Sequence, residues 1–277
     1  MKYQVGEQVD IRGPMRYARN MNSDLRELLL TSDPVRGLKA LKDKGILGDL
    51  EPTLAALEME IPAGYNHKNN LTHSFEVLQN AIDRETDGPD LILRTAALFH
   101  DIGKPDTREF GKRGIVTFTN HDVVGSKIVR RVLPKHGYSK SETDKIARLV
   151  FMHMRSHTFE LGWSESAVRR LITDAGSNVQ LERLIVIFYS DATTKIPGKK
   201  ESLHSKVKAL GDELARVEAA DARAALRPAL NGNEIAEFLG IKPGPELGKV
   251  MKFLNSDENV GLSRDETLAL VEAKFKA

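Results

Sequence analysis

The sequence predicts an all-α fold, with one small β-hairpin in the middle and further helical segments at both ends of the chain. Most segments repeat apolar residues every three or four positions, which is the spacing of amphipathic helices. Near 108–118, glycines separate β-prone residues, and this composition favours a short hairpin. The chain has 277 residues, 40% of them apolar and none a cysteine, so it can bury a core without disulfide bonds.

The predicted helices begin after residue 24 and follow one another closely. Two short helices cover about 25–41, where Asp33 and Pro34 are typical of a helix start. Another helix lies near Leu54, and the turn-forming stretch 62–70 follows it. The central helices are expected at about 71–83, 89–100, 121–134, 141–156, 164–174 and 178–192.

A charged helix is expected at about 199–225, and prolines and glycines then separate short helices in a tail. These signals divide the chain into an N-terminal helical segment (1–61), a central domain (62–200) and a C-terminal helical tail (201–277). No apolar run approaches the ~20 residues of a membrane span, and the first thirty residues lack the apolar core of a signal peptide. We therefore expect a cytoplasmic protein without a membrane partner.

The charges are unevenly distributed, although their sum is only +2. Residues 101–160 hold 12 Lys and Arg against 7 Asp and Glu. Such an excess would favour anionic substrates such as phosphate esters or RNA. A solvated helical surface accounts for it equally well.

Several ionisable side chains fall on apolar helix faces, where they would point to the interior. His153, for example, lies four residues after Leu149 and three after Val150. The residues with this placement are His100 with Asp101, His121, His153 and Asp191. A buried histidine taken alone is more often a hydrogen-bonded core residue. Burying this whole set would cost several kcal/mol per unpaired charge, so a shared metal ion is the better explanation.

The stretch Leu98-Phe-His-Asp-Ile-Gly-Lys104, preceded by His73 and followed by Asp191, resembles the His…His-Asp…Asp signature of the HD superfamily. His121 and His153 resemble the two additional histidines of HD proteins with two metal ions. The resemblance implies an HD helical bundle and a centre of one or two divalent ions, with Mn, Ni, Co, Mg, Fe and Zn all left open. The implied ligands are His73, His100, Asp101, His121, His153 and Asp191.

Two further segments resemble bacterial tRNA nucleotidyltransferases (CCA-adding enzymes) and the related poly(A) polymerases. Residues 31–38 and 45–47 are similar to the segment before the HD domain of that family, and 226–250 to its C-terminal tRNA-contacting region. The catalytic head of the family needs an Asp-x-Asp pair beside a Gly-Ser or Gly-Gly turn, and this chain has no such pair. The resemblance is thus to the HD and C-terminal region without the nucleotidyltransferase head, and we do not expect nucleotide addition.

The resemblance implies an enzyme, a metal-dependent phosphodiesterase or phosphatase for nucleotides or RNA ends such as 2′,3′-cyclic phosphates. A metal-bound hydroxide would attack phosphorus. Asp101 would bridge ions or orient this nucleophile, and Lys104 would hold a phosphate oxygen unless it is an ordinary solvated lysine. Additional substrate-binding candidates near the ligand-bearing segments are Thr107, Arg108, Arg155 and the loop residue His67.

Two other functions stay open at this point. The chain could be a tRNA- or RNA-binding module that keeps the HD scaffold with little catalysis, or, by a second HD resemblance, a di-iron oxygenase. The expected partner is a nucleotide or RNA, including tRNA, while the sequence leaves the oligomeric state and a separate head open. The histidines at 136, 157 and 204 lie in polar surroundings and are expected at the surface.

Overall fold

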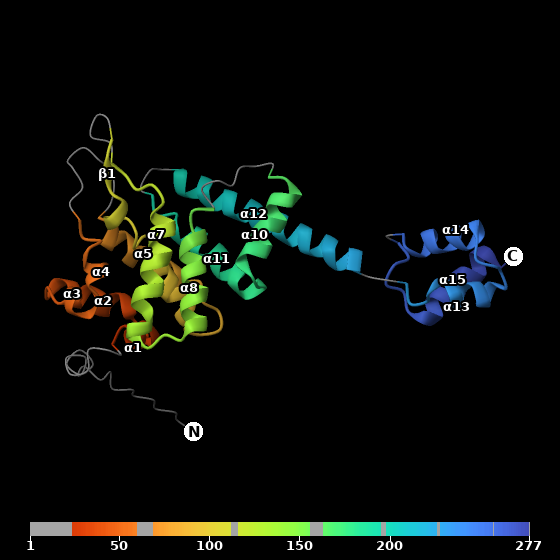
Figure 1. The fold of residues 1–277 in the computed structure, drawn as a ribbon, viewed down its shortest axis with the longest axis horizontal. Coiled ribbons are helices and arrows are strands. Elements are labelled where there is room, and N and C mark those ends of the chain that lie inside the picture. The colour runs from red at the N-terminus through yellow and green to blue at the C-terminus, as the bar shows by residue number, and fades with distance from the viewer. Residues whose placement is uncertain are drawn as a thin grey trace, which may run out of the picture. The chain divides into compact units, whose positions relative to one another are not determined.

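The computed structural model describes residues 24–59, 69–111, 116–155, 163–194, 198–225, 228–256 and 258–276. It confirms the all-α fold with a single predicted hairpin near 108–118 (Figure 1). The chain divides into two compact units, Met1–Gly211 and Asp212–Ala277. The three-part domain division stays a prediction. In the described ranges, no helix combines the length and apolar character needed to cross a membrane.

Among the described residues before position 60, four short helices precede the central bundle: α1 (Asp24–Leu30), α2 (Pro34–Asp43), α3 (Leu47–Leu50) and α4 (Pro52–Ala55). The predicted start of α2 is confirmed, because Asp33 accepts a hydrogen bond from the backbone N–H of Arg36 at 3.0 Å and Pro34 opens the helix. Arg94 of α6 (Leu91–Phe99) donates to the carbonyl oxygens of Leu29 and Thr31 at 2.7 and 2.9 Å. These bonds fasten the end of α1 to the central bundle.

The central bundle consists of α5 (Asn70–Ile82), α6 (Leu91–Phe99), α7 (His121–Val132), α8 (Lys140–Met152), α10 (Glu165–Ala175) and α11 (Asn178–Asp191), with short 3-10 turns η2 (Pro105–Thr107) and η4 (Leu133–His136). Helix α6 packs against α5, α8 and α11, and all of its residues from Leu93 to Phe99 are buried. Its C-terminal end therefore delivers the next residues, His100 and Asp101, into the protein interior.

The hairpin connects η2 to α7. Its strands β1 (Glu109–Phe110) and β2 (Val116–Thr117) are antiparallel, with Phe110 opposite Val116 and Glu109 opposite Thr117. Helix α8 begins with a capping box, in which Ser139 and Glu142 each bond the other's backbone N–H. Glu142 also accepts a hydrogen bond from Arg26 of α1 at 2.9 Å.

Helix α12 (Lys199–Ala225) runs from the first unit into the second, which also contains α13 (Gly232–Leu239), α14 (Pro245–Leu254) and α15 (Arg264–Phe275). The three helices α13 to α15 enclose a small apolar core of Leu230, Ile235, Val250, Leu254 and Val271. Capping boxes begin α13 and α15. The predicted tail of short helices is thus present.

The expected surface position of His136 is wrong. Its side chain is buried, and its Nε2 lies 2.9 Å from Oε2 of Glu51, another buried residue. Glu51 also caps α4 by accepting from the backbone N–H of Thr53. His204 is half-buried, with Nε2 3.2 Å from the carbonyl oxygen of Tyr189, and His157 lies outside the described residues.

Candidate metal centre

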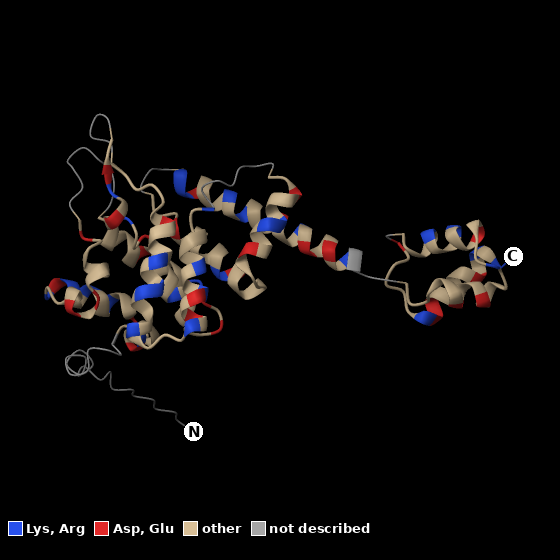
Figure 2. Ribbon diagram, viewed as in Figure 1, with Lys and Arg blue, Asp and Glu red and all other residues tan. Residues whose placement is uncertain are grey.

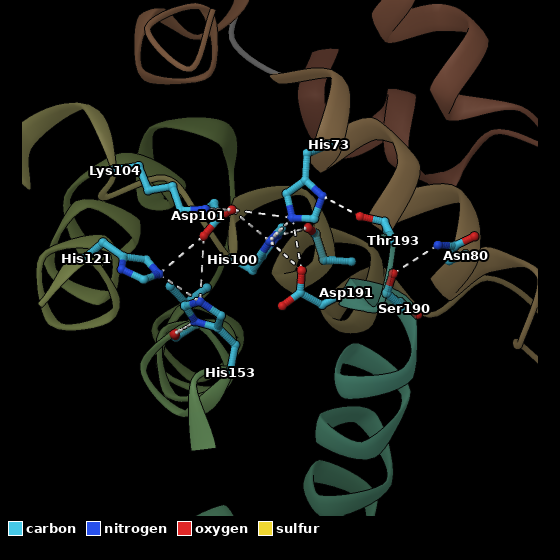
Figure 3. A network of polar contacts seen from close by, with 12 residues as sticks. His73, Asn80, His100, Asp101, Lys104, His121, His153, Ser190, Asp191 and Thr193 are labelled. Atoms are coloured by element: carbon cyan, nitrogen blue, oxygen red, sulfur yellow. Dashed lines mark hydrogen bonds and ion pairs between the residues drawn. The ribbon is translucent and has the colours of Figure 1, made fainter. Parts of the chain in front are cut away.

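Six ionisable side chains meet inside the bundle, and each comes from the end of a helix (Figure 3). His73 lies in the first turns of α5, His121 opens α7, and Asp191 ends α11. His100 and His153 are the C-terminal caps of α6 and α8, and Asp101 follows His100. Tertiary packing of five helices therefore brings together residues that are up to 118 positions apart, from 73 to 191.

Four of these residues form a first group of donor atoms around one point. Nε2 of His73 lies 3.1 Å from Nε2 of His100, 3.0 Å from Oδ1 of Asp191 and 3.5 Å from Oδ2 of Asp101. Nε2 of His100 lies 3.2 Å from the same Asp101 oxygen and 3.6 Å from the Asp191 oxygen. His73 and Asp191 are half-buried, so this group is the one nearer to solvent.

The second group is buried and shares Asp101 with the first. Nε2 of His121 lies 3.1 Å from Nε2 of His153 and 3.3 Å from Oδ1 of Asp101, and Nε2 of His153 lies 3.7 Å from that oxygen. Asp101 thus turns Oδ2 to the first group and Oδ1 to the second. In Figure 3 its carboxylate stands between the two sets of histidines.

The spacing of these atoms fits coordination of metal ions. Ligand atoms 2.0–2.2 Å from an ion, in tetrahedral or octahedral arrangement, lie about 2.8–3.6 Å from one another. The distances within the two groups run from 3.0 to 3.7 Å. Imidazole nitrogen and carboxylate oxygen are ligands that first-row divalent metals accept. Two groups that could hold a metal are therefore present in the described residues, namely His73 with His100 and Asp101, and Asp101 with His121 and His153.

The Nδ1 atom of each histidine, the ring nitrogen that does not face the centre, is within hydrogen-bond distance of another protein group. Nδ1 of His100, His121 and His153 lies 2.8, 2.8 and 2.6 Å from the backbone carbonyl oxygen three residues earlier. Nδ1 of His73 instead lies 3.0 Å from the hydroxyl oxygen of Thr193. A proton on Nδ1 leaves the lone pair on Nε2, the atom that faces the centre.

The turn after Asp101 packs directly on the start of α7 and depends on glycine. A Cβ added at Gly103 would overlap the backbone carbonyl oxygen of His121 and come within 2.6 Å of the backbone nitrogen of Gly125. Gly103 therefore allows α7 to approach closely enough for His121 to reach the Asp101 carboxylate. Asn120, directly before His121, has a left-handed backbone with φ of 61°, a conformation that asparagine tolerates better than most residues.

The burial of the cluster and its internal charges shift the ionisation of its members. Burial, and after it the charge of the neighbouring His100, lower the pKa of His153 to about 3, so His153 is neutral at pH 7. Burial alone would raise the pKa of Asp101, but the charges of His100 and Lys104 outweigh it and hold this pKa well below its ordinary value. Burial alone would lower the pKa of His100, but the charge of Asp101 raises it. An ionised carboxylate and a neutral buried imidazole are the forms that bind metals.

Lys104 lies beside the six candidate metal ligands, and its ammonium donates a hydrogen bond to Oδ2 of Asp101 at 2.6 Å. The hydroxyl of Thr107 donates to the carbonyl oxygen of Gly103 at 3.0 Å, and Arg155 pairs with Asp174 at 3.7 Å. The guanidinium of Arg108 lies over the ring of Phe110. Substrate roles for Thr107, Arg108 and Arg155 stay predictions, and His67 lies outside the described residues.

Three further residues support the centre and are not among those predicted from the sequence. Thr193 orients His73, and Asn80 donates to the carbonyl oxygen of Ser190 at 2.9 Å, which fixes the end of α11 just before Asp191. Gly103 makes room for α7. A glycine two residues after the histidine-aspartate pair could have suggested close packing, but Thr193 and Asn80 carry no periodic signal.

Comparison with known proteins matches residues 70–225 to the HD-domain family. The chain is 27% identical over 254 residues to the A-adding tRNA nucleotidyltransferase of Deinococcus radiodurans, covering 90% of this chain and 56% of the relative. It is 30% identical over 242 residues to the CC-adding tRNA nucleotidyltransferase of Thermus thermophilus, covering 84% and 51%. It is also 25% identical over 161 residues to a bifunctional uridylyltransferase/uridylyl-removing enzyme of Cereibacter sphaeroides, covering 50% and 16%.

The predicted resemblance is thus confirmed, and the chain spans about half the length of the two tRNA nucleotidyltransferases. The match to the family model includes all six donors of the centre and extends over more than half of the chain. The chain therefore belongs to the HD-domain family.

Proposed function

We propose that the protein is a divalent-metal-dependent phosphohydrolase that acts on nucleotides or RNA ends, such as 2′,3′-cyclic phosphates. The observation that carries this proposal is the pair of donor groups that share Asp101, with donor spacings of 3.0 to 3.7 Å. An HD domain and a buried His/Asp cluster together support a hydrolase that depends on a metal. The proposed centre holds one or two divalent ions, and the metal analysis described below identifies the native metal and counts the ions.

Divalent ions held there would lower the pKa of a coordinated water and polarise a phosphoryl oxygen. Asp101 would serve both ions, because its two oxygens face different groups of histidines. His121 and His153 lie in the buried group and would position the inner ion, away from bulk water. His73 and Asp191, which are half-buried, would hold the ion nearer to solvent and to an arriving substrate.

Lys104 would bind the phosphate. Its side chain retains 20% of its exposure, whereas that of Asp101 retains 3%, so the ammonium reaches from the interior toward the surface. A compact positive charge at this place can contact a non-bridging phosphate oxygen and pull the substrate toward Asp101. Phosphate binding is also the role that the sequence predicts for Lys104.

The substrate class rests on the relatives. Two of them are named as enzymes that add nucleotides to tRNA, and they match nearly the whole of this chain. An RNA 3′ end or a mononucleotide carries the phosphate ester that such a centre would cleave. We therefore infer phosphodiesterase or phosphatase activity on these molecules.

The test combines metal analysis with hydrolysis. Protein purified without chelator is analysed by inductively coupled plasma mass spectrometry and assayed on 2′,3′-cyclic nucleotides with Mn²⁺, Ni²⁺, Co²⁺ or Mg²⁺. We expect about one or two ions per chain. Metal and activity should both be lost in the double variant His100→Ala/Asp101→Ala and kept in His204→Ala, which changes a histidine outside the centre. Metal-free, inactive wild-type protein would refute the proposal, as would a double variant that stays active.

A second candidate function is RNA binding, which the basic surface of α7, η4 and α8 favours. Figure 2 shows Lys and Arg along α7 and α8. The exposed basic residues here are Lys127, Arg130, Arg131, Lys135, Lys140, Lys145 and Arg148. Such a surface attracts phosphate backbones without reading their sequence.

The RNA-binding candidate has its own test. Affinity for tRNA is measured by filter binding over a range of salt concentrations. If RNA binding is the function, the double variant Lys127→Ala/Arg131→Ala lowers the slope of log K against log salt by about one per lost phosphate contact. The variant His100→Ala/Asp101→Ala should then bind as the wild type does. Absence of tRNA binding at moderate salt would exclude this function.

A further inference from the structure

One face of the hairpin presents an exposed aromatic ring beside a cation. Phe110 is 60% exposed, more than any other large apolar side chain in the described part of the chain. The guanidinium carbon of Arg108 lies 5.1 Å from the centre of the Phe110 ring. Arg108 has an extended backbone and precedes Phe110 by two positions, so both side chains lie on the same face of the hairpin.

This face leads to the metal centre. Val116 lies opposite Phe110, so these two side chains share the face that also carries Arg108, and Phe118 follows Val116 by two residues. Two residues of chain span at most roughly 7 Å, so Phe118 lies within this distance of Val116 along the backbone. The ring centre of Phe118 lies 5.5 Å from Nζ of Lys104, and its carbonyl oxygen lies 2.8 Å from Nδ1 of His121. The strand that pairs with Phe110 is therefore joined by two residues to Phe118, which lies beside Lys104 and His121.

We propose that Phe110, flanked by Arg108, stacks on the base of a nucleotide whose phosphate lies at Asp101 and Lys104. This inference rests on the proposed function and names a base-binding site for it. Aromatic rings and guanidinium planes are the groups on which unpaired bases stack. The positive charge of Arg108 beside the ring also suits a polyanionic ligand.

The size of the site fits a base better than a protein. A stable protein interface covers roughly 800 Å² on each partner, whereas one aromatic side chain offers about 150–250 Å². Strands β1 and β2 have two residues each, so they offer little edge for an added strand. The occupant is therefore a single base, either of a mononucleotide or of the last residue of an RNA.

The first experiment compares a substrate that carries a base with one that lacks it. Wild type, Phe110→Ala and Phe110→Trp are assayed on 2′,3′-cyclic AMP and on 1,2-cyclic glycerol phosphate. The ratio of kcat/KM for the two substrates should fall about ten-fold or more in Phe110→Ala, because stacking on one aromatic ring typically contributes this much to binding. Phe110→Trp should restore the ratio, since tryptophan also offers a face for stacking.

The matched control is Phe151→Ala. Phe151 is another exposed aromatic residue of the same unit, on α8 two positions before His153. Two positions on a helix are about 200° apart, so Phe151 faces away from the centre. Its substitution should leave the substrate ratio unchanged.

A binding measurement separates this inference from the proposed function. Isothermal titration with AMP, which needs no turnover, should give a Kd about ten-fold or more higher for Phe110→Ala than for wild type. If wild type hydrolyses its substrates and Phe110→Ala changes neither the ratio, nor the Kd, nor the hydrolysis of the oligoribonucleotide described below, the base site is refuted and the hydrolase stands. If AMP binding depends on Phe110 but nothing is hydrolysed, the hydrolase fails and the base site stands.

The source of the base is decided by a third substrate. An oligoribonucleotide that ends in a 2′,3′-cyclic phosphate is assayed beside cyclic AMP with both variants. A defect of Phe110→Ala on the oligoribonucleotide and on cyclic AMP assigns the site to nucleotides in general. A defect on the oligoribonucleotide alone assigns it to the last base of an RNA.

Discussion

Replacing His153 by alanine should remove one bound ion and leave the other. The inner donor group consists of His121, His153 and one oxygen of Asp101, separated by 3.1 to 3.7 Å. His153→Ala leaves two donors of these three. Loss of a residue that only orients a ligand already lowers metal affinity about 10- to 100-fold, so loss of a ligand itself should exceed roughly 100-fold.

Variants of the other ligands, His73→Ala and Asp101→Ala, should lose different numbers of metal ions per chain. His73→Ala affects only the outer group, because the Nε2 contacts of His73 run to His100, Asp101 and Asp191. Asp101→Ala should empty both groups, since each uses one oxygen of this carboxylate. Metal per chain is measured by inductively coupled plasma mass spectrometry after dialysis against graded Mn²⁺, and circular dichroism checks that each variant is folded.

The metal content of the three variants tests whether the six ligands form two separate metal sites. For two ions, we expect the metal content of His153→Ala and His73→Ala to fall to about half, and that of Asp101→Ala to near zero. If either single histidine variant lost all metal, the six donors would form one indivisible site. If His153→Ala kept the full metal content at limiting Mn²⁺, the inner group would not be a metal site.

Three further substitutions test the support of the centre. Gly103→Ala should lower the free energy of unfolding by roughly 1–3 kcal/mol in urea, because its Cβ overlaps the backbone of His121; wild-type stability would contradict this. Thr193→Val removes the partner of His73 Nδ1 and should weaken metal binding about 10- to 100-fold by calorimetry, and unchanged affinity would show that this hydrogen bond is dispensable. Glu142→Gln should cost about 1 kcal/mol at pH 7. The hydrogen bond from Arg26 of α1 lowers the pKa of Glu142 from 4.5 to about 2, so the stability that the ionised carboxylate contributes is complete above pH 4.5 and vanishes toward pH 2. In urea unfolding, the free energies of wild type and Glu142→Gln should therefore converge near pH 2. A difference between them that does not change with pH would argue against this reasoning.

The elements of the fold could be predicted because their signals are local. The start of α2 follows from Asp33 and Pro34, and the structure has the expected cap there. The helices α5, α6, α7, α8 and α11 lie close to their predicted ranges, since apolar spacing within each helix marks the buried face. The inward direction of His100, His121 and His153 follows from the same spacing, and all three are buried.

The supporting contacts could not be predicted, because their partners are far apart in the sequence. The polar neighbours of His136 in the sequence predict a surface residue, yet its side chain contacts Glu51, 85 positions earlier. Thr193 meets His73 across 120 positions. Only the packing of η4 on the N-terminal helices and of α11 on α5 brings these residues together. The position of His73 in the centre was likewise inferred by resemblance, and not from its helix face.

The hydrogen bonds behind the histidines explain how an all-α fold builds this centre. The last carbonyl groups of a helix lack partners within it, and those of Ala97 and Val150 are used by His100 and His153. One bond thus satisfies a carbonyl that has no partner within its helix and fixes an imidazole whose Nε2 faces inward. His73 lies at the beginning of α5, where no such carbonyl is spare, and therefore takes its partner from Thr193 beyond α11. The outer donor group consequently depends on tertiary packing at two helix ends, whereas the two histidines of the inner group are oriented by their own local backbone.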